Sequence, residues 1–188
     1  MKKLTIGMTM LLLGNTFLFD QNENVSHLGK VLVIYYSYSV NANTEKIAKI
    51  IQSLTRANMY KIDLVEPFPD MPHEAFTQRI REEQAKENYP AIKTPNIDIS
   101  SYDCIFVGGP VWWHTTPLPL TSFLLETDFK GKPVVPFATS ESNPREFLED
   151  FAKIAQNARI LNGKIFGYVW QDEQIEAKVA QWVKGLQL

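Results

Sequence analysis

The chain has 188 residues, a length that suits one domain with its own apolar core. Apolar residues make up 45% and charged residues 21%, which excludes a disordered or low-complexity chain. The 19 basic and 21 acidic side chains leave a formal charge of -2 and give no sign of the basic face that nucleic-acid binding requires. Cys104 is the only cysteine, which excludes an intrachain disulfide, and no Cys/His spacing indicates a metal site.

The first 29 residues differ in character from the rest. Lys2 and Lys3 precede an apolar run over residues 4–13, the order found in secretory signals, but no small-x-small cleavage site follows. A cleaved export signal, an uncleaved tether with membrane contact through residues 1–19, and a misassigned start or extra strand all remain open. The first two make the protein exported or membrane-tethered, and the third makes it cytoplasmic. Residues 20–29 are polar, so we expect residues 1–29 to be a signal-like or tethering segment plus linker, and residues 30–188 to be the domain.

Short β-branched and aromatic runs then alternate with segments of helical period, the pattern of an α/β fold with a parallel sheet. Strands are expected at residues 30–36, 59–64, 103–108, 133–138 and 164–169. Helices are expected after Asn43 and Thr44, which can cap the first one, over residues 73–88 on the rim, and from about Pro117, Pro144 and Asp172. Right-handed crossovers favour a three-layer, doubly wound parallel sheet of five strands in the order 2-1-3-4-5.

Ligands of such sheets bind at the carboxyl ends of the strands, so the loops after strands one, three and four are the candidate site. The first of these loops, residues 37–44, is rich in hydroxyl and amide groups and runs directly into a helix. A helix amino terminus presents free N–H groups to an anion, and Ser37, Ser39, Asn43 and Thr44 can add hydrogen bonds to a phosphate. The alternative is that these residues simply form a turn and a helix cap.

Two adjacent tryptophans, Trp112 and Trp113, follow strand three on the second loop. Large aromatic side chains are costly to leave in water, so a planar ligand stacked on one indole would explain them, whereas core packing of both is the alternative. We expect one of them to face a ligand and the other to face the core. The third loop, residues 139–143, supplies small polar groups before a helix, and Asn143 can cap that helix. It would form the opposite wall of the cleft.

Three motifs in order resemble the flavodoxin-like family that includes flavodoxins and flavin reductases. They are VLVIYYSYSVNANTEKIA at residues 31–48, YDCIFVGGPVWWHTTPLPL at residues 102–120 and GKPVVPFATSESN at residues 131–143. The second motif, with Gly-x-Pro-x-Trp-Trp, is specific, and the match continues more weakly to the end of the chain. The resemblance implies noncovalent FMN, with the phosphate in the first loop and the isoalloxazine ring between the second and third loops. It assigns to FMN Ser37, Ser39, Val40, Asn41, Ala42, Asn43, Thr44, Pro110, Val111, Trp112, Trp113, His114, Thr115, Thr139, Ser140, Glu141 and Ser142.

The chain departs from the family pattern at two places. Val40, Asn41 and Ala42 stand where the family has a single glycine, so the phosphate loop is longer and its amides are expected to be oriented differently. His114 replaces a common glycine, which puts a titratable imidazole near the flavin in a tuning role or leaves it as a solvent-facing loop residue.

If FMN binds, the flavin carries the redox chemistry and no protein catalytic residue is required. The resemblance therefore implies an electron carrier with a redox partner protein, or an FMN-dependent NAD(P)H or quinone oxidoreductase with a small-molecule acceptor. The alternative is a flavin-free binding or structural domain that has kept the fold and lost the phosphate loop. A hydrolase is disfavoured because no Ser/His/Asp or Cys/His order stands out, and Cys104 lies in the middle of an apolar strand.

Overall fold

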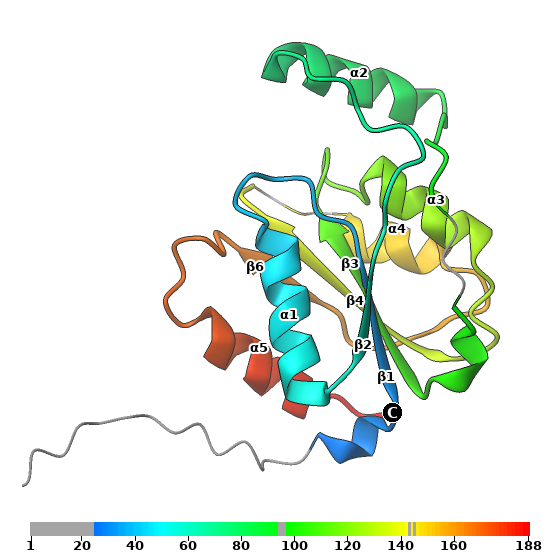
Figure 1. Cartoon of the computed structure of the whole chain (residues 1–188), viewed down its shortest axis with the longest axis vertical. Helices are drawn as coiled ribbons and strands as arrows, with labels where there is room; N and C mark the ends of the chain where they lie inside the picture. Colours follow the sequence, from blue (N-terminus) through cyan, green and yellow to red (C-terminus); the bar gives the residue numbers. More distant parts are fainter. Residues whose placement is uncertain (1–24, 94–96, 143, 145) are drawn as a thin grey trace, which may run out of the picture.

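The computed structural model describes residues 25–93, 97–142, 144 and 146–188. Within them the chain forms one parallel sheet in the order β2-β1-β3-β4-β5, with β6 also paired to β4 (Figure 1). The expected strand order 2-1-3-4-5 is confirmed. The strands are β1 (Val31–Tyr35), β2 (Asn58–Lys61), β3 (Cys104–Pro110), β4 (Pro133–Ser140), β5 (Arg159–Ile160) and β6 (Lys164–Gly167). The α-helices are α1 (Asn43–Thr55), α2 (His73–Ala85), α3 (Leu118–Glu126), α4 (Phe147–Ile154) and α5 (Ile175–Lys184).

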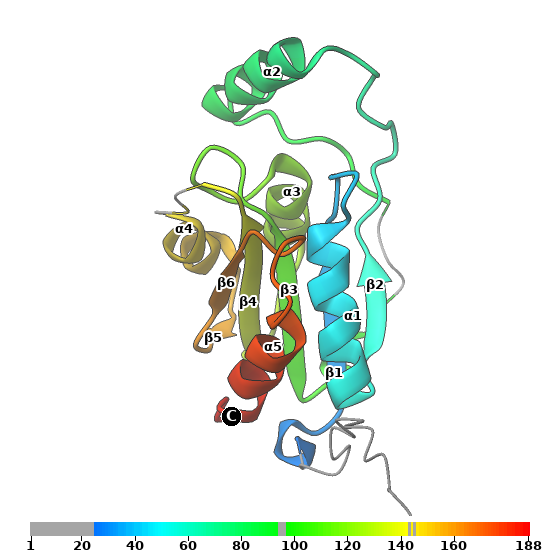
Figure 2. The same ribbon diagram turned by 90° about the vertical axis from the view of Figure 1, so that its left-hand side faces the viewer.

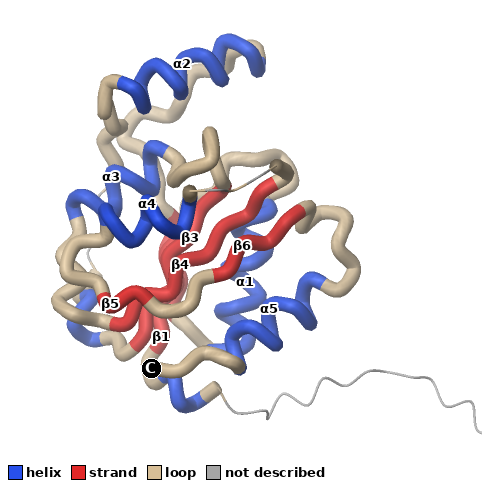
Figure 3. Tube along the Cα trace, turned by 180° about the vertical axis from the view of Figure 1, so that it is seen from behind, coloured by secondary structure: helices blue, strands red, loops and turns tan. Residues whose placement is uncertain are grey.

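Two helical layers cover the sheet. Helices α1 and α5 lie on one face, and α3 and α4 lie on the other, as the view along the sheet and the view from behind both show (Figures 2 and 3). Successive residues of β1 separate accordingly, because side chains alternate across a strand. Val31 and Val33 belong to the core on the α1 side, whereas Leu32 and Ile34 belong to the core on the α3 side. This two-sided burial explains why β1 has an uninterrupted apolar sequence.

The last position of the sheet is occupied by two short strands instead of the single one expected. β5 pairs with Pro133 and Val134 of β4, and β6 pairs with the stretch from Phe137 to Ser140. The segment between them contains Gly163, where a Cβ atom would lie 2.6 Å from Pro136 Cγ. The expected strand at residues 164–169 corresponds to β6, which ends at Gly167. The sequence analysis missed β5, because only two residues pair there.

Strand ends at the carboxyl edge, the edge where the parallel strands end, also differ from expectation. β3 continues to Pro110 and β4 continues to Ser140, because Gly109 pairs with Ala138 and Pro110 pairs with Thr139. β2 ends at Lys61 instead of residue 64, and Leu64 forms only an isolated antiparallel bridge with Ile92. The ladder between β3 and β4 thus reaches into two of the loops expected from the sequence.

Helix α2 lies above the carboxyl edge and clear of both helical layers (Figures 1 and 2). Pro67, Pro69 and Pro72 precede it, and each removes a backbone N–H that a strand or helix interior would need. The expectation of a charged helix on the rim is confirmed, although the helix ends at Ala85 instead of residue 88.

The folded part of the chain begins upstream of Lys30. Ser26–Leu28 form a short 3-10 helix at the amino edge of the sheet, and Leu28 is completely buried. His27 Nε2 lies 2.9 Å from the Leu186 carbonyl oxygen, which ties this segment to the carboxyl end of the chain. Among the described residues no helix has both the length and the apolarity to span a membrane. The expected signal-like or tethering residues 1–19 lie outside the described residues.

We predict that Gly108→Ala destabilises the fold by about 1–3 kcal/mol, the usual cost of overpacking a core. A Cβ atom at Gly108 would lie 2.5 Å from the Phe137 carbonyl oxygen and 2.6 Å from two carbons of the Phe137 ring. Gly167→Ala is the control, because its Cβ would meet only Ser140 O at 3.8 Å. Urea unfolding monitored by circular dichroism measures both changes. Equal effects of the two variants would contradict the close approach of β3 and β4.

A second prediction concerns alkaline stability. Burial raises the pKa of the Cys104 thiol to about 12. The unfolded chain releases this proton near the ordinary thiol pKa of about 8.5, so the free energy of unfolding falls between these two pH values by about 1.4 kcal/mol per pH unit. Cys104→Ala should lack this component, and urea unfolding at pH 8, 9 and 10 compares the two proteins. Parallel pH profiles would rule out the predicted contribution of the thiol.

Candidate functional site

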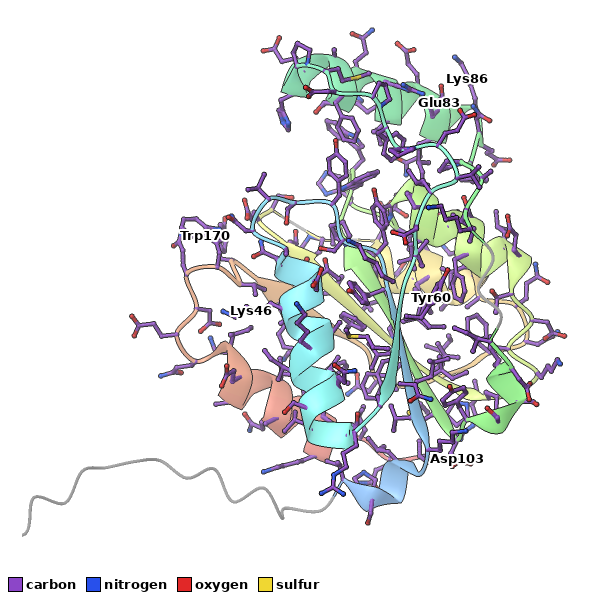
Figure 4. The ribbon with its side chains drawn as sticks, viewed as in Figure 1. Lys46, Tyr60, Glu83, Lys86, Asp103 and Trp170 are labelled. Carbon is purple, nitrogen blue, oxygen red and sulfur yellow. The ribbon has the colours of Figure 1, made fainter. Side chains whose placement is uncertain are left out.

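The three candidate loops meet at the carboxyl edge. They follow β1, β3 and β4, which are neighbours in the sheet. Parallel pairing brings the ends of these strands to the same edge, as the sequence analysis expected. The loop that follows β6, which contains Trp170, lies beside them (Figure 4).

The first loop contains a tight turn over Ser39–Ala42. The Ala42 N–H donates to the Ser39 carbonyl at 2.9 Å, and the Asn43 N–H donates to Ser39 Oγ at 3.5 Å. Ala42 has φ 48° and ψ 37°, a left-handed conformation that glycine adopts without strain and alanine adopts at a cost of about 1 kcal/mol. The turn therefore forms without a glycine, and it delivers the chain to the amino end of α1.

Asn43 and Thr44 do not cap α1, contrary to expectation. The N-cap residue is Ala42, and both side chains lie buried in the first helical turn. Thr44 Oγ1 shares a buried hydrogen bond of 2.8 Å with Thr139 Oγ1, and Asn43 Nδ2 donates to Glu141 Oε1 at 3.4 Å. These two side chains connect the first loop to the third instead of closing the helix end.

One buried polar atom stands out at this junction. Among the described residues, Asn43 Oδ1 is the buried side-chain oxygen or nitrogen atom that has no hydrogen-bond partner. Its amide nitrogen is directed to Glu141, so the oxygen points elsewhere. A buried acceptor without a donor costs about 1–3 kcal/mol, which a ligand hydroxyl or N–H would offset.

The second loop is a two-residue reverse turn. Trp112 and Thr115 exchange both backbone hydrogen bonds, at 3.1 and 3.0 Å. Trp113 and His114 between them have φ values of 49° and 71°, as a type I′ turn requires. Thr115 Oγ1 donates to Asp150 Oδ2 at 2.6 Å, and the His114 carbonyl accepts from the Glu146 N–H at 3.0 Å. The loop is thus held to α4 and the residue before it.

The two tryptophans have different surroundings. Trp112 is half-buried and packs against the core on the α3 side. It is also the centre of an aromatic cluster whose rings lie 5.6–6.0 Å from its own; the other members are Tyr36, Tyr38, Phe68 and Phe76. Trp113 is 43% exposed at the tip of the turn, with the Arg81 guanidinium 4.8 Å from its ring centre. Contact of either ring with a ligand stays a prediction.

The third loop is shorter than expected. Thr139 and Ser140 are buried residues of β4. Ser140 Oγ accepts from the Ser142 N–H at 3.1 Å and lies 2.8 Å from the Ser142 carbonyl oxygen, to which it donates. Glu141 and Ser142 are exposed. Asn143, the expected cap of the next helix, lies outside the described residues, and α4 begins at Phe147 with Glu146 as its N-cap.

A pocket of about 480 Å³ lies between the second loop and α2. Its lining residues come from both elements and from the third loop: His73, Phe76, Thr77, Ile80, Val111, Trp112, Trp113, His114 and Ser142. The sequence analysis placed this helix on the rim and missed its contribution to the pocket, because many of its residues are charged. The signal that could have revealed it is the pair Phe76 and Ile80, one helical turn apart.

Two tyrosines at the end of β1 remain protonated at neutral pH. Burial, with a smaller contribution from Glu45, raises the pKa of Tyr35 to about 12. Burial also raises the pKa of Tyr36, and Tyr38 adds to that increase. A tyrosine of ordinary pKa is already neutral at pH 7, and the increase extends the neutral form of both phenols to higher pH, so they bring no negative charge to a bound anion.

One comparison with known proteins identifies the family. The sequence profile of a family described as Flavodoxin matches residues 30–186. No curated protein sequence matches the chain.

Two solved structures are similar over most of the chain. A protein from Bacteroides eggerthii that is regarded as a flavoprotein has 26% identity and a TM-score of 0.66, covering 82% of this chain and 95% of its own. A flavoprotein from Lactobacillus acidophilus, solved in complex with FMN, has 24% identity and a TM-score of 0.64, and the match covers 79% of this chain and 97% of that flavoprotein. The latter likeness concerns the fold alone.

We predict that Thr44→Val destabilises the protein by about 1–3 kcal/mol, because Thr139 Oγ1 then lies buried without a partner. The double variant Thr44→Val/Thr139→Val should recover part of this loss, since both polar groups are gone. Urea unfolding of the wild-type protein, both single variants and the double variant gives the coupling energy. Additive effects would mean that the two hydroxyls do not depend on each other.

Proposed function

The chain is a member of the flavodoxin family, and from the geometry of its carboxyl edge we propose that it holds one FMN there and transfers electrons. The phosphate lies at the turn Ser39–Ala42 and the amino end of α1. The isoalloxazine ring lies between the second and third loops. The observation that most supports this proposal is the unpartnered Asn43 Oδ1. This atom lies at the junction of the first and third loops, where the chain that joins the phosphate to the isoalloxazine ring would have to pass.

The donors and acceptors at this edge fit the parts of FMN. The first-turn N–H groups of α1 and the hydroxyls of Ser37 and Ser39 suit a phosphate, although residues 37–44 contain no Lys or Arg. Asn43 lies next to Glu141 of the third loop, between the phosphate position and the ring position. Its free oxygen can accept a hydrogen bond from a ribityl hydroxyl. The ionised phosphate could not be its partner, because the phosphate oxygens are acceptors as well. Aromatic side chains at the second loop suit a flat ring.

The residues of the chain position the cofactor and control its surroundings. When bound, FMN supplies the redox chemistry itself. The Trp112–Thr115 turn gives one side of the ring site a rigid backbone, since both of its hydrogen bonds and its contacts to Asp150 and Glu146 fix its position. Aromatic rings packed around Trp112 exclude water from that side. His114, which is exposed at the turn, is a candidate for tuning the ring edge electrostatically.

The electron donor distinguishes two versions of this function. A reductase should be reduced rapidly by NADH or NADPH and turn over with an acceptor, whereas a carrier needs a partner enzyme. Flavin reduction by NAD(P)H no faster than in buffer would favour the carrier.

We also propose that residues 1–19 direct export or tether the protein to a membrane, because Lys2 and Lys3 precede an apolar run. Cell fractionation tests this, and recovery only in the cytosol would contradict it.

FMN binding to the full chain is the direct test, measured by quenching of flavin fluorescence and by the rise in melting temperature. Asn43→Ala should weaken FMN binding about tenfold, because the ribityl hydroxyl loses its acceptor. Asn58→Ala is the matched control: Asn58 donates to Tyr102 at the start of β2, far from the carboxyl edge, and should leave the affinity unchanged. Absence of FMN binding by the wild-type chain would overturn the proposal in favour of a flavin-free domain.

A further inference from the structure

We propose that a cavity between α3 and the segment leading into β3 binds a small organic cation, an ammonium group carried on a compact apolar body. This α3 cavity has a volume of about 270 Å³ and lies on the α3 side of the sheet. None of the described residues that line it is among those assigned to FMN. The inference goes beyond the proposed function and requires no bound cofactor.

The course of the chain between α2 and β3 explains why space remains there. Among the described residues of this stretch, only Ile99–Ser101 are helical, and they form a single 3-10 turn. An α-helix with its side chains is about 10–12 Å across, and irregular chain fills less of the layer beside α3. The cavity opens where this thinner segment meets the carboxyl-terminal end of α3, at the opposite end of that helix from the second loop.

Five apolar side chains form the floor and walls of the α3 cavity. Ile34, Ile92 and Phe123 belong to the buried core on this side of the sheet, and Ile97 and Ile99 pack against that core while partly buried. The volume corresponds to roughly nine water molecules, and such walls offer water few hydrogen-bond partners. Displacement of this water by a single apolar ring is therefore favourable.

The charged residues of the cavity are mostly acidic. Asp98, Glu126 and Asp128 line it together with Lys130, and all four are exposed. Lys130 lies near both aspartates, and Lys132 acts on Asp98 from outside the cavity. The ion pairs between described residues all lie elsewhere, so none of these carboxylates has a direct cationic partner. A ligand ammonium would supply that partner, whereas a ligand carboxylate would add like charge.

Two of the carboxylates are held in place by the chain itself. Asp98 Oδ1 accepts from the Ser100 N–H at 3.0 Å and from Ser100 Oγ at 2.6 Å. Asp128 Oδ1 accepts from the Lys130 N–H at 2.9 Å and from Asn157 Nδ2 at 3.0 Å. These hydrogen bonds lower the pKa of both carboxyl groups, chiefly through the Ser100 hydroxyl for Asp98 and the Lys130 N–H for Asp128. Both groups therefore carry their negative charge in a fixed position.

A larger pocket of about 680 Å³ beside α2 is the weaker candidate. Several of the apolar residues that line it are exposed, among them Val65, Pro67 and Pro69. A ligand there would gain less from leaving water than one enclosed by Ile34 and Phe123.

The test uses 2-phenylethylammonium as the probe, with 2-phenylethanol and phenylacetate as neutral and anionic analogues of similar shape. Each is titrated into the 15N-labelled full chain without FMN at neutral pH and low salt, and amide shifts in NMR spectra locate and quantify binding. Asp98→Asn/Glu126→Gln removes two negative charges and keeps an oxygen that can accept from Ser100. Glu149→Gln/Glu176→Gln is the matched control, because both residues are exposed and lie outside the lining of the cavity.

We expect the ammonium probe to bind about tenfold more tightly than the alcohol, with the largest shifts at residues 97–101 and 123–130, and phenylacetate not to bind. Asp98→Asn/Glu126→Gln should weaken ammonium binding about fivefold and leave alcohol binding unchanged, while the control variant behaves as wild type.

A second pair of variants tests the cavity itself. Ile99→Trp fills it and should weaken binding of both the ammonium and the alcohol about tenfold. Leu125→Trp makes the same addition at an exposed position next to Glu126 and should have no effect.

Three results would overturn the proposal. Equal affinity for the ammonium and the alcohol, or equal effects of the two double variants, would show that the carboxylates do not select the ligand. Shifts confined to other parts of the chain would place binding elsewhere, and absence of binding by the wild-type chain would reject the site. If Ile99→Trp does not fold, Asp98→Asn/Glu126→Gln decides alone. Because the chain is flavin-free in this experiment, failure of FMN binding would leave its outcome unchanged.

Discussion

A buried hydrogen bond between Thr44 and Thr139 ties the amino end of α1 to the carboxyl end of β4. These residues are 95 positions apart in the chain, and β3 lies between β1 and β4 in the sheet. The bond therefore sets the distance between the first and third loops across the switch point of the strand order. The contact of Asn43 with Glu141 adds to the same junction. Any ligand that spans both loops depends on this fixed spacing, and so does the placement of the second loop between them.

A second constraint comes from the connection between β2 and β3, whose described residues form no α-helix that packs on the sheet. The connection rises to the carboxyl edge instead, where α2 gives its apolar face to Trp112 and the first loop. The sheet below is covered by other residues of the α3-side core, among them Ile92 and Phe123. The segment that in a plain crossover would add to the core thus lines a pocket with the second loop. Its apolar residues Phe76 and Ile80 pack toward the first and second loops.

Much of the fold was predictable because its signals are local. The apolar run of β1 and the helical period after it each indicated an element at the correct place, and strand order followed from general rules of crossover handedness. The two-residue strand β5 carries no such signal. The buried roles of Asn43 and Thr44 were missed because a capping residue and a core-facing first-turn residue have the same sequence pattern. The inward face of α2 depends on where two long connections place the helix, and no local pattern encodes that.

The position of α2 has a further consequence for how this protein can change over time. Because the helix touches the rest of the molecule through a few side chains above the sheet, substitutions on it affect neither the strand ladders nor the two helical layers. Exposed residues of α2 such as Gln78 can vary at little cost to the fold, whereas Phe76 and Ile80 contribute packing that a substitution would lose. Selection can therefore change the outer surface of this helix separately from the packing that holds the fold together.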